Sequence, residues 1–276
     1  MLTCGESIRK RLVRVLFLCA GLYVLAGIGC ASCQRRLIYF PPVFTSEQVD
    51  ERAKGEGLER WKTAGGECLG WKRLAAVQPA KGQVLITHGN ADCAFQCGHF
   101  ADVIQQVAPL DVFILEFPGY ADRPGKPSEH SVDEAAAEAI QILPTNTPLY
   151  LVGESLGTGV ATYLAGRFPQ RVAGIALLAP YNRLADVAQW HIRIFPVSWI
   201  LRDRFPAEED LRNYQGRLAV LVGGKDIVVP AKFGRRLYDG YTGPKQLWEF
   251  PDMTHDSLMV QPPEIWRQIV GFWNGR

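Results

Sequence analysis

The sequence has almost no net charge and no long run of charge of one sign. Its 276 residues carry 30 Lys and Arg against 28 Asp and Glu, a formal net charge of +2 at pH 7. Binding of nucleic acid requires a surface that neutralises phosphates, and no segment of this chain supplies one. The composition therefore argues against a nucleic-acid partner.

Low-complexity sequence and internal repeats are also missing. The 27 glycines and 18 prolines are far fewer than in low-complexity chains, and no period of 20–50 residues recurs. A disordered chain, a collagen and a solenoid are therefore excluded. With 47% hydrophobic and 21% charged residues, the chain can bury a full core. The length that remains after an N-terminal leader fits one α/β domain.

The cysteines form no zinc or redox set. Cys30 and Cys33 make a CxxC pair at the end of the leader, but no second pair and no nearby His completes it. We therefore expect no metal-binding or redox role for this pair. The odd total forbids pairing every cysteine within one chain, and the sequence does not indicate which would pair. The seven are Cys4, Cys19, Cys30, Cys33, Cys68, Cys93 and Cys97.

Residues 1–34 form the leader. The chain is apolar or small from Val15 to Ala31, which is long enough for a thin bilayer and longer than the core of a typical cleaved signal. We predict an uncleaved single-pass anchor. Four basic residues (Arg9, Lys10, Arg11 and Arg14) precede the run and only Arg35 and Arg36 follow it. The positive-inside bias then leaves the N-terminus cytoplasmic and places the rest outside, in the periplasm if the source is bacterial.

Other fates of the leader stay open. A signal peptidase could cleave near Ala31, where the residues are small, Cys30 could carry a lipid, or the segment could be a buried helix of a soluble protein. The lipid is disfavoured, because Gly27, Ile28 and Gly29 precede Cys30 where a lipoprotein signal usually has a Leu. A soluble helix is disfavoured because the run has no polar face.

From Gln83 onward, short β-rich runs alternate with amphipathic segments. This alternation predicts a mostly parallel sheet with helices on both faces, the body of the domain formed by residues 35–276. Upstream, the runs Leu58–Lys62 and Glu67–Arg73 flank Ala64-Gly65-Gly66 and predict an antiparallel hairpin. The predicted strands of the body are Val84–Thr87, Val112–Glu116, Leu149–Val152, Ile175–Leu178, Leu218–Val222 and Gln246–Phe250.

Helix signals lie between these strands. Phe100 to Val107 has apolar residues at helical spacing, Ser131 with Glu134 predicts a capping box that opens a helix to Leu143, and Pro262-Pro263 opens the last helix. Residues 181–211 interrupt the alternation and predict a small helical cap. Their apolar side chains would either line an acyl-chain site or pack the cap onto the body. They are Trp190, Ile192, Ile194, Phe195, Val197, Trp199, Ile200 and Leu201.

A G-x-S-x-G motif stands between a predicted strand and a predicted helix. It reads Gly153-Glu154-Ser155-Leu156-Gly157 and follows the strand ending at Val152. In that setting the serine lies on a strained turn with its hydroxyl above the sheet, and the glycines allow the close approach that such a turn needs. Ser155 is therefore the candidate nucleophile.

A serine nucleophile needs a base, and the base needs an acid to hold its tautomer. His255 follows the last predicted strand and Asp226 follows the one before it. Both stand at carboxyl ends of strands, where open α/β sheets place their sites. The chain order Ser155, Asp226, His255 is that of α/β-hydrolases.

His88 also follows a strand, in Thr87-His88-Gly89-Asn90. We interpret it as structural, because this turn is better placed to offer backbone N–H groups to a developing oxyanion. The expected donors are the N–H groups of Asn90 and Leu156, with Ala91 as the alternative to Asn90. His99, His130 and His191 have no such loop context, and we expect packing or surface roles for them.

These residues resemble the α/β-hydrolase superfamily, and within it the membrane-anchored serine hydrolases related to Bem46 and the ABHD13/ABHD17-like proteins. The resemblance covers about Arg36 to the C-terminus. It is carried by Gln34 to Tyr39, His88 to Ala91, Pro118-Gly119-Tyr120, Gly125 to Glu129, Gly153 to Thr158, Asp226 to Pro230, and His255.

The resemblance implies an α/β-hydrolase fold and hydrolysis of an ester, thioester or amide through an acyl-enzyme, without metal or organic cofactor. The implied partner is a small-molecule or lipid acyl substrate. Two alternatives remain: a catalytically silent α/β-hydrolase fold that serves as a binding module, and an acyltransferase that uses the same residues and excludes water. The sequence does not indicate the oligomeric state.

Overall fold

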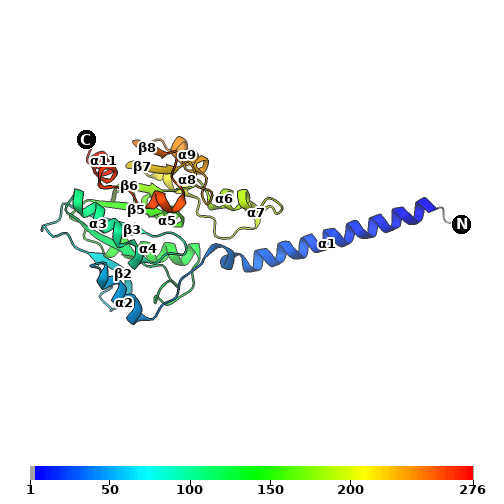
Figure 1. Cartoon of the computed structure of the whole chain (residues 1–276), viewed down its shortest axis with the longest axis horizontal. Coiled ribbons are helices and arrows are strands. Elements are labelled where there is room, and N and C mark those ends of the chain that lie inside the picture. Colours follow the sequence, from blue (N-terminus) through cyan, green and yellow to red (C-terminus); the bar gives the residue numbers. More distant parts are fainter. Residues whose placement is uncertain (1–3, 276) are drawn as a thin grey trace.

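A mixed eight-stranded sheet forms the centre of the protein (Figure 1). The computed structural model describes residues 4–275, with side chains described from residue 9 onward. The strand order is β1-β2-β4-β3-β5-β6-β7-β8. The strands are β1 Glu59–Lys62, β2 Cys68–Arg73, β3 Gly82–Thr87, β4 Leu110–Leu115, β5 Leu149–Glu154, β6 Val172–Leu178, β7 Arg217–Gly223 and β8 Lys245–Phe250.

The direction of the strands follows the sequence prediction. β1 pairs antiparallel with β2, which is the predicted hairpin, and β2 pairs antiparallel with β4. All other neighbours are parallel. The predicted mostly parallel sheet is therefore confirmed, and the carboxyl ends of β3, β5, β7 and β8 meet at one edge of it.

Helices connect the strands. The long ones are α1 Cys4–Ile38, α2 Ser46–Gly55, α3 Gly98–Val107, α4 Glu129–Ile142, α5 Leu156–Arg167, α6 Leu184–His191, α9 Ala231–Gly240 and α11 Pro263–Trp273. The short ones are η1 Ala94–Cys97, α7 Val197–Ile200, α8 Ala207–Asp210, η2 Leu211–Asn213 and α10 His255–Met259. The segment 181–211, expected to be a cap, contains α6, α7 and α8.

The central strand β5 shows that helices cover both faces. The Tyr150 ring stacks on Trp273 of α11 with ring centroids 4.6 Å apart, whereas a Cβ on Gly153 would lie 3.0 Å from Ala161 of α5. Residues three apart on a strand point to opposite faces, so α11 and α5 lie on opposite sides. α3 packs beside α11, and α4 and α8 pack beside α5.

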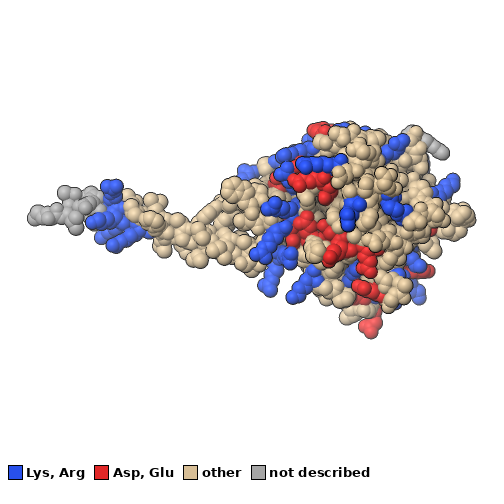
Figure 2. Space-filling view, turned by 180° about the vertical axis from the view of Figure 1, so that it is seen from behind, with Lys and Arg blue, Asp and Glu red and all other residues tan. Residues whose placement is uncertain are grey.

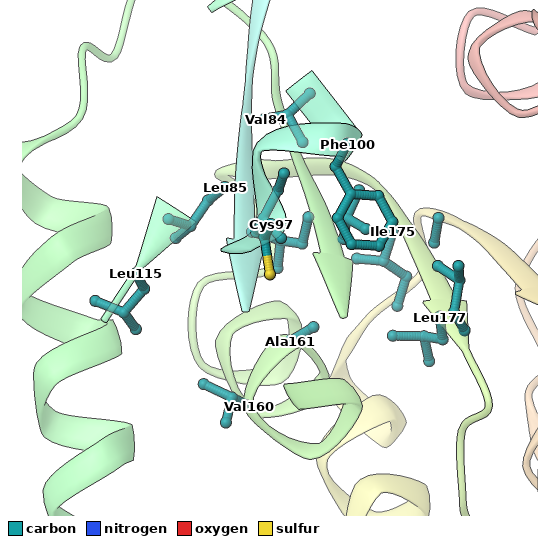
Figure 3. Close-up of a cluster of buried hydrophobic side chains, with 14 of the residues drawn as sticks. Val84, Leu85, Cys97, Phe100, Leu115, Val160, Ala161, Ile175 and Leu177 are labelled. Carbon is teal, nitrogen blue, oxygen red and sulfur yellow. The ribbon is translucent and has the colours of Figure 1, made fainter. Parts of the chain in front are cut away.

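The core lies between these layers. Figure 3 shows side chains of η1, α3 and α5 directed toward the strands, among them Cys97, Phe100 and Ala161. Val84, Ile86 and Val152 are fully buried, and all other positions of β3 and β5 are buried as well. Strands buried on both faces read as continuous apolar runs, which is why this part of the sequence predicts them well.

The start of α4 differs from the prediction. The N-cap is Ser128, three residues earlier than expected, and Ser131 is the third residue of the helix. The Ser131 hydroxyl accepts from the Ser128 N–H at 3.0 Å and the Ser128 hydroxyl accepts from the Ser131 N–H at 3.0 Å. The predicted capping box of Ser131 with Glu134 is therefore wrong, because a second serine takes the place that Glu or Gln usually has.

α1 projects from the domain as a rod (Figure 1). Within residues 4–275 it is the one helix long and apolar enough to cross a membrane, with a mean hydropathy of 2.1 over its most apolar 18 residues and none of that stretch buried. Its length and composition are compatible with a membrane anchor. Cys19, Cys30, Cys33, Cys68, Cys93 and Cys97 are free thiols, and the side chain of Cys4 lies outside the described residues.

Candidate active site

Ser155 lies on a strained turn between β5 and α5. Its backbone has φ 48° and ψ −114°, a left-handed conformation that costs a residue with a side chain about 1–3 kcal/mol. The turn is held from two sides: the Ser155 N–H donates to the Leu178 carbonyl of β6 at 2.9 Å, and the Thr158 hydroxyl donates to the Ser155 carbonyl at 2.7 Å. The structure therefore fixes the serine in the geometry that the motif predicts.

Gly157 explains why the motif ends in glycine. A Cβ at this position would overlap the carbonyl oxygen of Thr87 at the end of β3. The Thr87 hydroxyl donates to the Gly157 carbonyl at 2.8 Å, so the first turn of α5 lies directly against the neighbouring strand. This contact places the Ser155 hydroxyl beside the turn that follows β3.

Asp226 and His255 come together because the loops after β7 and β8 pack closely. The Gly224 N–H donates to the Phe250 carbonyl at 2.8 Å and the Lys225 N–H to the Met253 carbonyl at 3.0 Å. A Cβ on Gly224 would overlap the Pro251 carbonyl, so only glycine permits this approach.

The three predicted side chains form a hydrogen-bonded row. His255 Nε2 lies 3.0 Å from Ser155 Oγ, and His255 Nδ1 lies 2.7 Å from Asp226 Oδ2. Asp226 Oδ1 accepts from the N–H groups of Val228 at 2.8 Å and Val229 at 2.7 Å, which leaves Oδ2 for the imidazole. The Asp226 side chain is 1% exposed and that of His255 is 15% exposed, so the acid is shielded and the base faces outward.

Comparison with known proteins identifies the family. Residues 83–212 match the family model described as alpha/beta hydrolase fold. An uncharacterised protein of Mycobacterium tuberculosis strain H37Rv is 30% identical over 235 residues, which covers 82% of each chain. The chain belongs to the α/β-hydrolase family.

Further relatives carry names that specify activities. The lysophosphatidylserine lipase ABHD12 of Bos taurus is 27% identical over 280 residues, covering 83% of this hydrolase and 69% of that protein. Est1E from Butyrivibrio proteoclasticus, solved with ferulic acid bound, superposes with a TM-score of 0.62 at 13% identity over 79% of this chain and 100% of that one. The monoacylglycerol lipase of Paleococcus ferrophilus superposes with a TM-score of 0.58 at 20% identity, covering 79% and 98%.

The family match has two consequences. It confirms the sequence-based resemblance to the α/β-hydrolase superfamily, and with its lipase and esterase relatives it identifies the chain as a hydrolase. The three-dimensional neighbours below 25% identity support the fold alone.

The turn after β3 contains Asn90, the source of one of the two expected oxyanion donors. The Asn90 side chain holds this turn: its Oδ1 accepts from the Tyr120 hydroxyl at 2.8 Å, from the Phe40 N–H at 3.0 Å and from the Ala91 N–H at 3.1 Å. The Ala91 N–H is thus engaged by a side chain. Leu156, the source of the second expected donor, is the first residue of α5.

His88 has a structural environment, as interpreted from the sequence. It is fully buried, its Nε2 lies 3.1 Å from Glu116 Oε1, and its ring lies 3.9 Å from that of Phe117 between centroids. Burial alone would lower the pKa of His88, but the Glu116 carboxylate outweighs it and raises this pKa above the ordinary value. The sequence gives no sign of Glu116 as the partner, because it stands 28 residues further along the chain.

The other histidines lie at varied places. His130 is exposed and lies 3.3 Å from Glu134, and the His191 Nε2–H donates to the Val228 carbonyl at 2.9 Å. His99 lies 3.2 Å from the Gln96 carbonyl and lines the hollow beside Ser155. Among residues 9–275, no group of three His, Cys, Asp or Glu side chains is arranged to hold a metal ion.

A hollow of about 350 Å³ opens beside Ser155 and His255. Its lining includes three carboxylates that the sequence did not single out, Asp92, Glu154 and Asp256. Burial, together with the neighbouring Asp92 carboxylate, raises the pKa of Glu154 to about 7. A buried carboxyl group that titrates near neutrality therefore adjoins the candidate nucleophile.

The apolar residues of the segment 181–211 do not line this hollow. Ile192, Phe195, Val197, Ile200 and Leu201 instead line a separate apolar hollow against the end of α1, shared with Cys30, Gln34 and Ile38. The apolar side chains of the segment 181–211 therefore do not form an acyl-chain site beside Ser155, which was one of the two alternatives drawn from the sequence.

Proposed function

We propose that this hydrolase is a membrane-tethered serine hydrolase that cleaves acyl esters or thioesters through an acyl-enzyme. Ser155 attacks the acyl carbonyl while His255 takes the serine proton. His255 then returns that proton to the leaving group, and Asp226 holds the imidazole in its tautomer and stabilises its cation. Water, activated by His255, releases the acid and restores Ser155.

One observation supports this proposal above the others. The row from Ser155 Oγ through His255 to Asp226, with separations of 3.0 and 2.7 Å, has the hydrogen-bond reach that proton transfer requires. Both Asp226 oxygens have partners, so the carboxylate is oriented before substrate binds. A silent binding module would have no need of such an arrangement.

The backbone N–H groups of Asn90 and Leu156 are the proposed oxyanion donors. Asn90 is favoured over Ala91, because the Ala91 N–H already donates to the Asn90 side chain. Donors of this kind stabilise the charge that develops on the carbonyl oxygen, and each contributes about 10²–10³ in rate.

Lipid acyl esters are the proposed substrate class. Relatives of this chain include proteins named as lysophosphatidylserine lipases, and a structural neighbour is a monoacylglycerol lipase. In the proposed arrangement residues 1–34 tether the domain 35–276 to the membrane that holds the substrate. The N-terminus lies on the cytoplasmic side, because basic residues cluster before the apolar run of α1.

Replacement of the nucleophile tests this proposal. Ser155→Ala should reduce kcat for a short p-nitrophenyl ester by on the order of 10⁶, if the three residues act as a unit. Ser46→Ala, at an exposed position of α2, is the control and should retain full activity. Undiminished turnover by a folded Ser155→Ala variant would contradict the assignment. Release of an acyl-transfer product in place of the free acid, when an alcohol is supplied, would favour the acyltransferase alternative.

A further inference from the structure

The segment from Trp190 to Leu201, here called the α6–α7 segment, packs against the C-terminal half of α1. The Tyr23 hydroxyl donates to the Ile194 carbonyl at 2.8 Å, and the Tyr23 ring stacks on Phe195 with centroids 5.0 Å apart. A Cβ on Gly27 would lie 3.7 Å from the Phe195 ring. Tyr23 and Gly27 belong to the apolar run of α1, so the segment extends alongside the part of the helix that would lie in lipid.

Two large apolar side chains of this segment face outward. Ile194 is 74% exposed and Trp199 is 84% exposed. α6 and α7 lie at the end of the domain from which α1 projects (Figure 1). Exposed apolar groups that cluster beside a candidate membrane span mark a surface for lipid or protein. Leu37 and Phe40, both 55% exposed, extend the apolar surface to the point where α1 joins the domain.

Side chains of the protein donate to three backbone carbonyls of the segment. The Gln189 amide donates to the Ile192 carbonyl at 3.0 Å and to the Phe195 carbonyl at 2.9 Å. Tyr23 serves the Ile194 carbonyl, and residue 196 is a proline without an N–H. In hydrocarbon an unpaired backbone group costs several kcal/mol. In water these carbonyls would be hydrated without help from the protein. Side-chain donors to the carbonyls of Ile192, Ile194 and Phe195 therefore fit a loop that enters lipid.

Contacts nearer the domain fix the segment to α1. The Gln34 amide oxygen accepts from the Arg202 N–H at 2.6 Å, and Arg35 Nε lies 3.0 Å from Asp203 Oδ2. These contacts make the α6–α7 segment and α1 one unit, so the depth of one in a membrane sets the depth of the other.

Charged groups lie where a headgroup layer would meet this unit. Arg36, Arg202 and Arg204 are exposed, and Figure 2 shows Lys and Arg side chains gathered where the rod meets the domain. The Arg193 guanidinium lies over the Trp190 ring at 4.6 Å, and Lys232 Nζ lies over the same ring at 3.0 Å from the centroid. Basic side chains above an apolar surface favour anionic phospholipids.

We propose that the α6–α7 segment enters the lipid bilayer beside α1, with Ile194, Phe195 and Trp199 in the acyl-chain region of one leaflet. The occupant of this surface is thus phospholipid. The inference rests on the proposed tether and extends it, because it makes the domain sit on the membrane in one orientation where a tether alone would let it swing.

The test uses the full chain reconstituted into phosphatidylcholine and phosphatidylglycerol vesicles whose acyl chains carry bromine, a short-range quencher of indole fluorescence. The emission of Trp199 is obtained by subtracting the fluorescence spectrum of Trp199→Phe from that of the wild type. Trp61→Phe is the matched control, because Trp61 lies in β1 and is 5% exposed. We expect brominated lipid to remove more than about half of the Trp199 emission and to leave the Trp61 emission unchanged. An apolar surface that inserts at the membrane interface reaches the boundary between headgroups and acyl chains, where the bromine atoms can quench an indole.

Flotation of the vesicles separates the two proposals. A chain that does not float contradicts both the tether and the docking. A chain that floats, but whose Trp199 emission is insensitive to brominated lipid and is quenched by aqueous acrylamide, retains the tether and contradicts the docking. A Trp199 insensitive to both quenchers also contradicts it, because another protein surface would then cover the segment.

A second pair of variants guards against local misfolding in Trp199→Phe. Ile194→Ser should weaken insertion and shift the Trp199 emission toward longer wavelength in vesicles. Val77→Ser removes a similarly exposed apolar side chain from the β2–β3 connection and should cause no shift. Equal spectra for Ile194→Ser and the wild type would overturn the inference.

Discussion

At the residue scale, the proposed acid is defined by how its two oxygens are used. Asp226 Oδ1 is held by two backbone N–H groups and Oδ2 is directed at His255. Asp226→Asn would keep the shape but offer His255 the wrong tautomer, and we expect a loss of roughly 10⁴ in kcat with little change in melting temperature. Steady-state hydrolysis of a p-nitrophenyl ester measures the change in kcat.

Asp252→Asn is the matched control for this variant. Asp252 lies in the loop that leads to His255, is 88% exposed and pairs with Lys225 at 2.7 Å. The control should retain near-normal kcat. Near-normal activity of Asp226→Asn itself would assign the acid to another residue.

Asp133 makes a pH-dependent contribution to stability. Its Oδ1 is buried and has no hydrogen-bond partner among residues 9–275, and burial, with Glu129 and Asp210 nearby, raises the pKa of Asp133 to about 8. The folded protein therefore holds a proton here that the unfolded chain releases near pH 4, so the free energy of unfolding falls as pH rises from about 4 to about 8.

Asp133→Asn should remove this fall in the free energy of unfolding between about pH 4 and about pH 8, because asparagine carries no carboxyl proton. We expect its melting temperature to exceed that of the wild type by at least ~2 °C at pH 8 and to match it near pH 4. Glu134→Gln, at an exposed position of the same helix, should leave the difference between the two pH values unchanged. A wild type whose melting temperature falls no more steeply with pH than that of Asp133→Asn would refute the buried acid.

At the scale of elements, the contact of α5 with β3 is the steric condition for the Ser155 turn. Gly157→Ala would drive a methyl group into the Thr87 carbonyl. We expect this change to lower the free energy of unfolding by more than ~2 kcal/mol, or to displace the turn and abolish activity.

Gly271→Ala is the matched control, because Gly271 lies in α11 with no atom within 4 Å of its added Cβ. Alanine is the better helix former, so this change should be neutral or stabilising by up to ~1 kcal/mol. Urea denaturation of both variants provides the comparison. Equal stability of Gly157→Ala and the wild type would mean that α5 can move away without cost.

Some elements follow from the sequence and others do not. The meeting of Ser155, Asp226 and His255 was predictable, because each follows a strand and parallel strands end at one edge. The start of α4 was not, because Ser128 and Ser131 both fit a cap and only the fold selects one. The surface that the α6–α7 segment faces was not predictable either, since apolar composition does not specify which apolar surface it meets.

The carboxylates around the site were also missed. Asp92 and Glu154 are far apart in sequence and come together only because β3 and β5 are neighbours. Glu154 gave one sign of an unusual acid, because it is an acidic residue inside a motif whose other positions are buried. Nothing in the sequence identifies Asp92 as its neighbour.

At the scale of the whole molecule, the hydrolase combines a rigid sheet edge with an apolar rod. The edge carries the hydrogen-bonded row of Ser155, His255 and Asp226. In the proposed arrangement, the rod with the α6–α7 segment orients that edge relative to a membrane. The two parts are linked through Asn90, whose side chain accepts from the Phe40 N–H just after α1 and whose backbone is a proposed oxyanion donor. In the proposed arrangement, the catalytic site and the membrane anchor are therefore connected through Asn90.

The most direct measurement of the central claim is peptide mapping after reaction of the full chain, in membrane vesicles, with a fluorophosphonate. This reagent forms a stable bond with a serine oxygen only where a base activates it. We expect one modified peptide, phosphonylated at Ser155, and no label in His255→Ala. Label on a different serine, or equal labelling of the wild type and His255→Ala, would contradict the account.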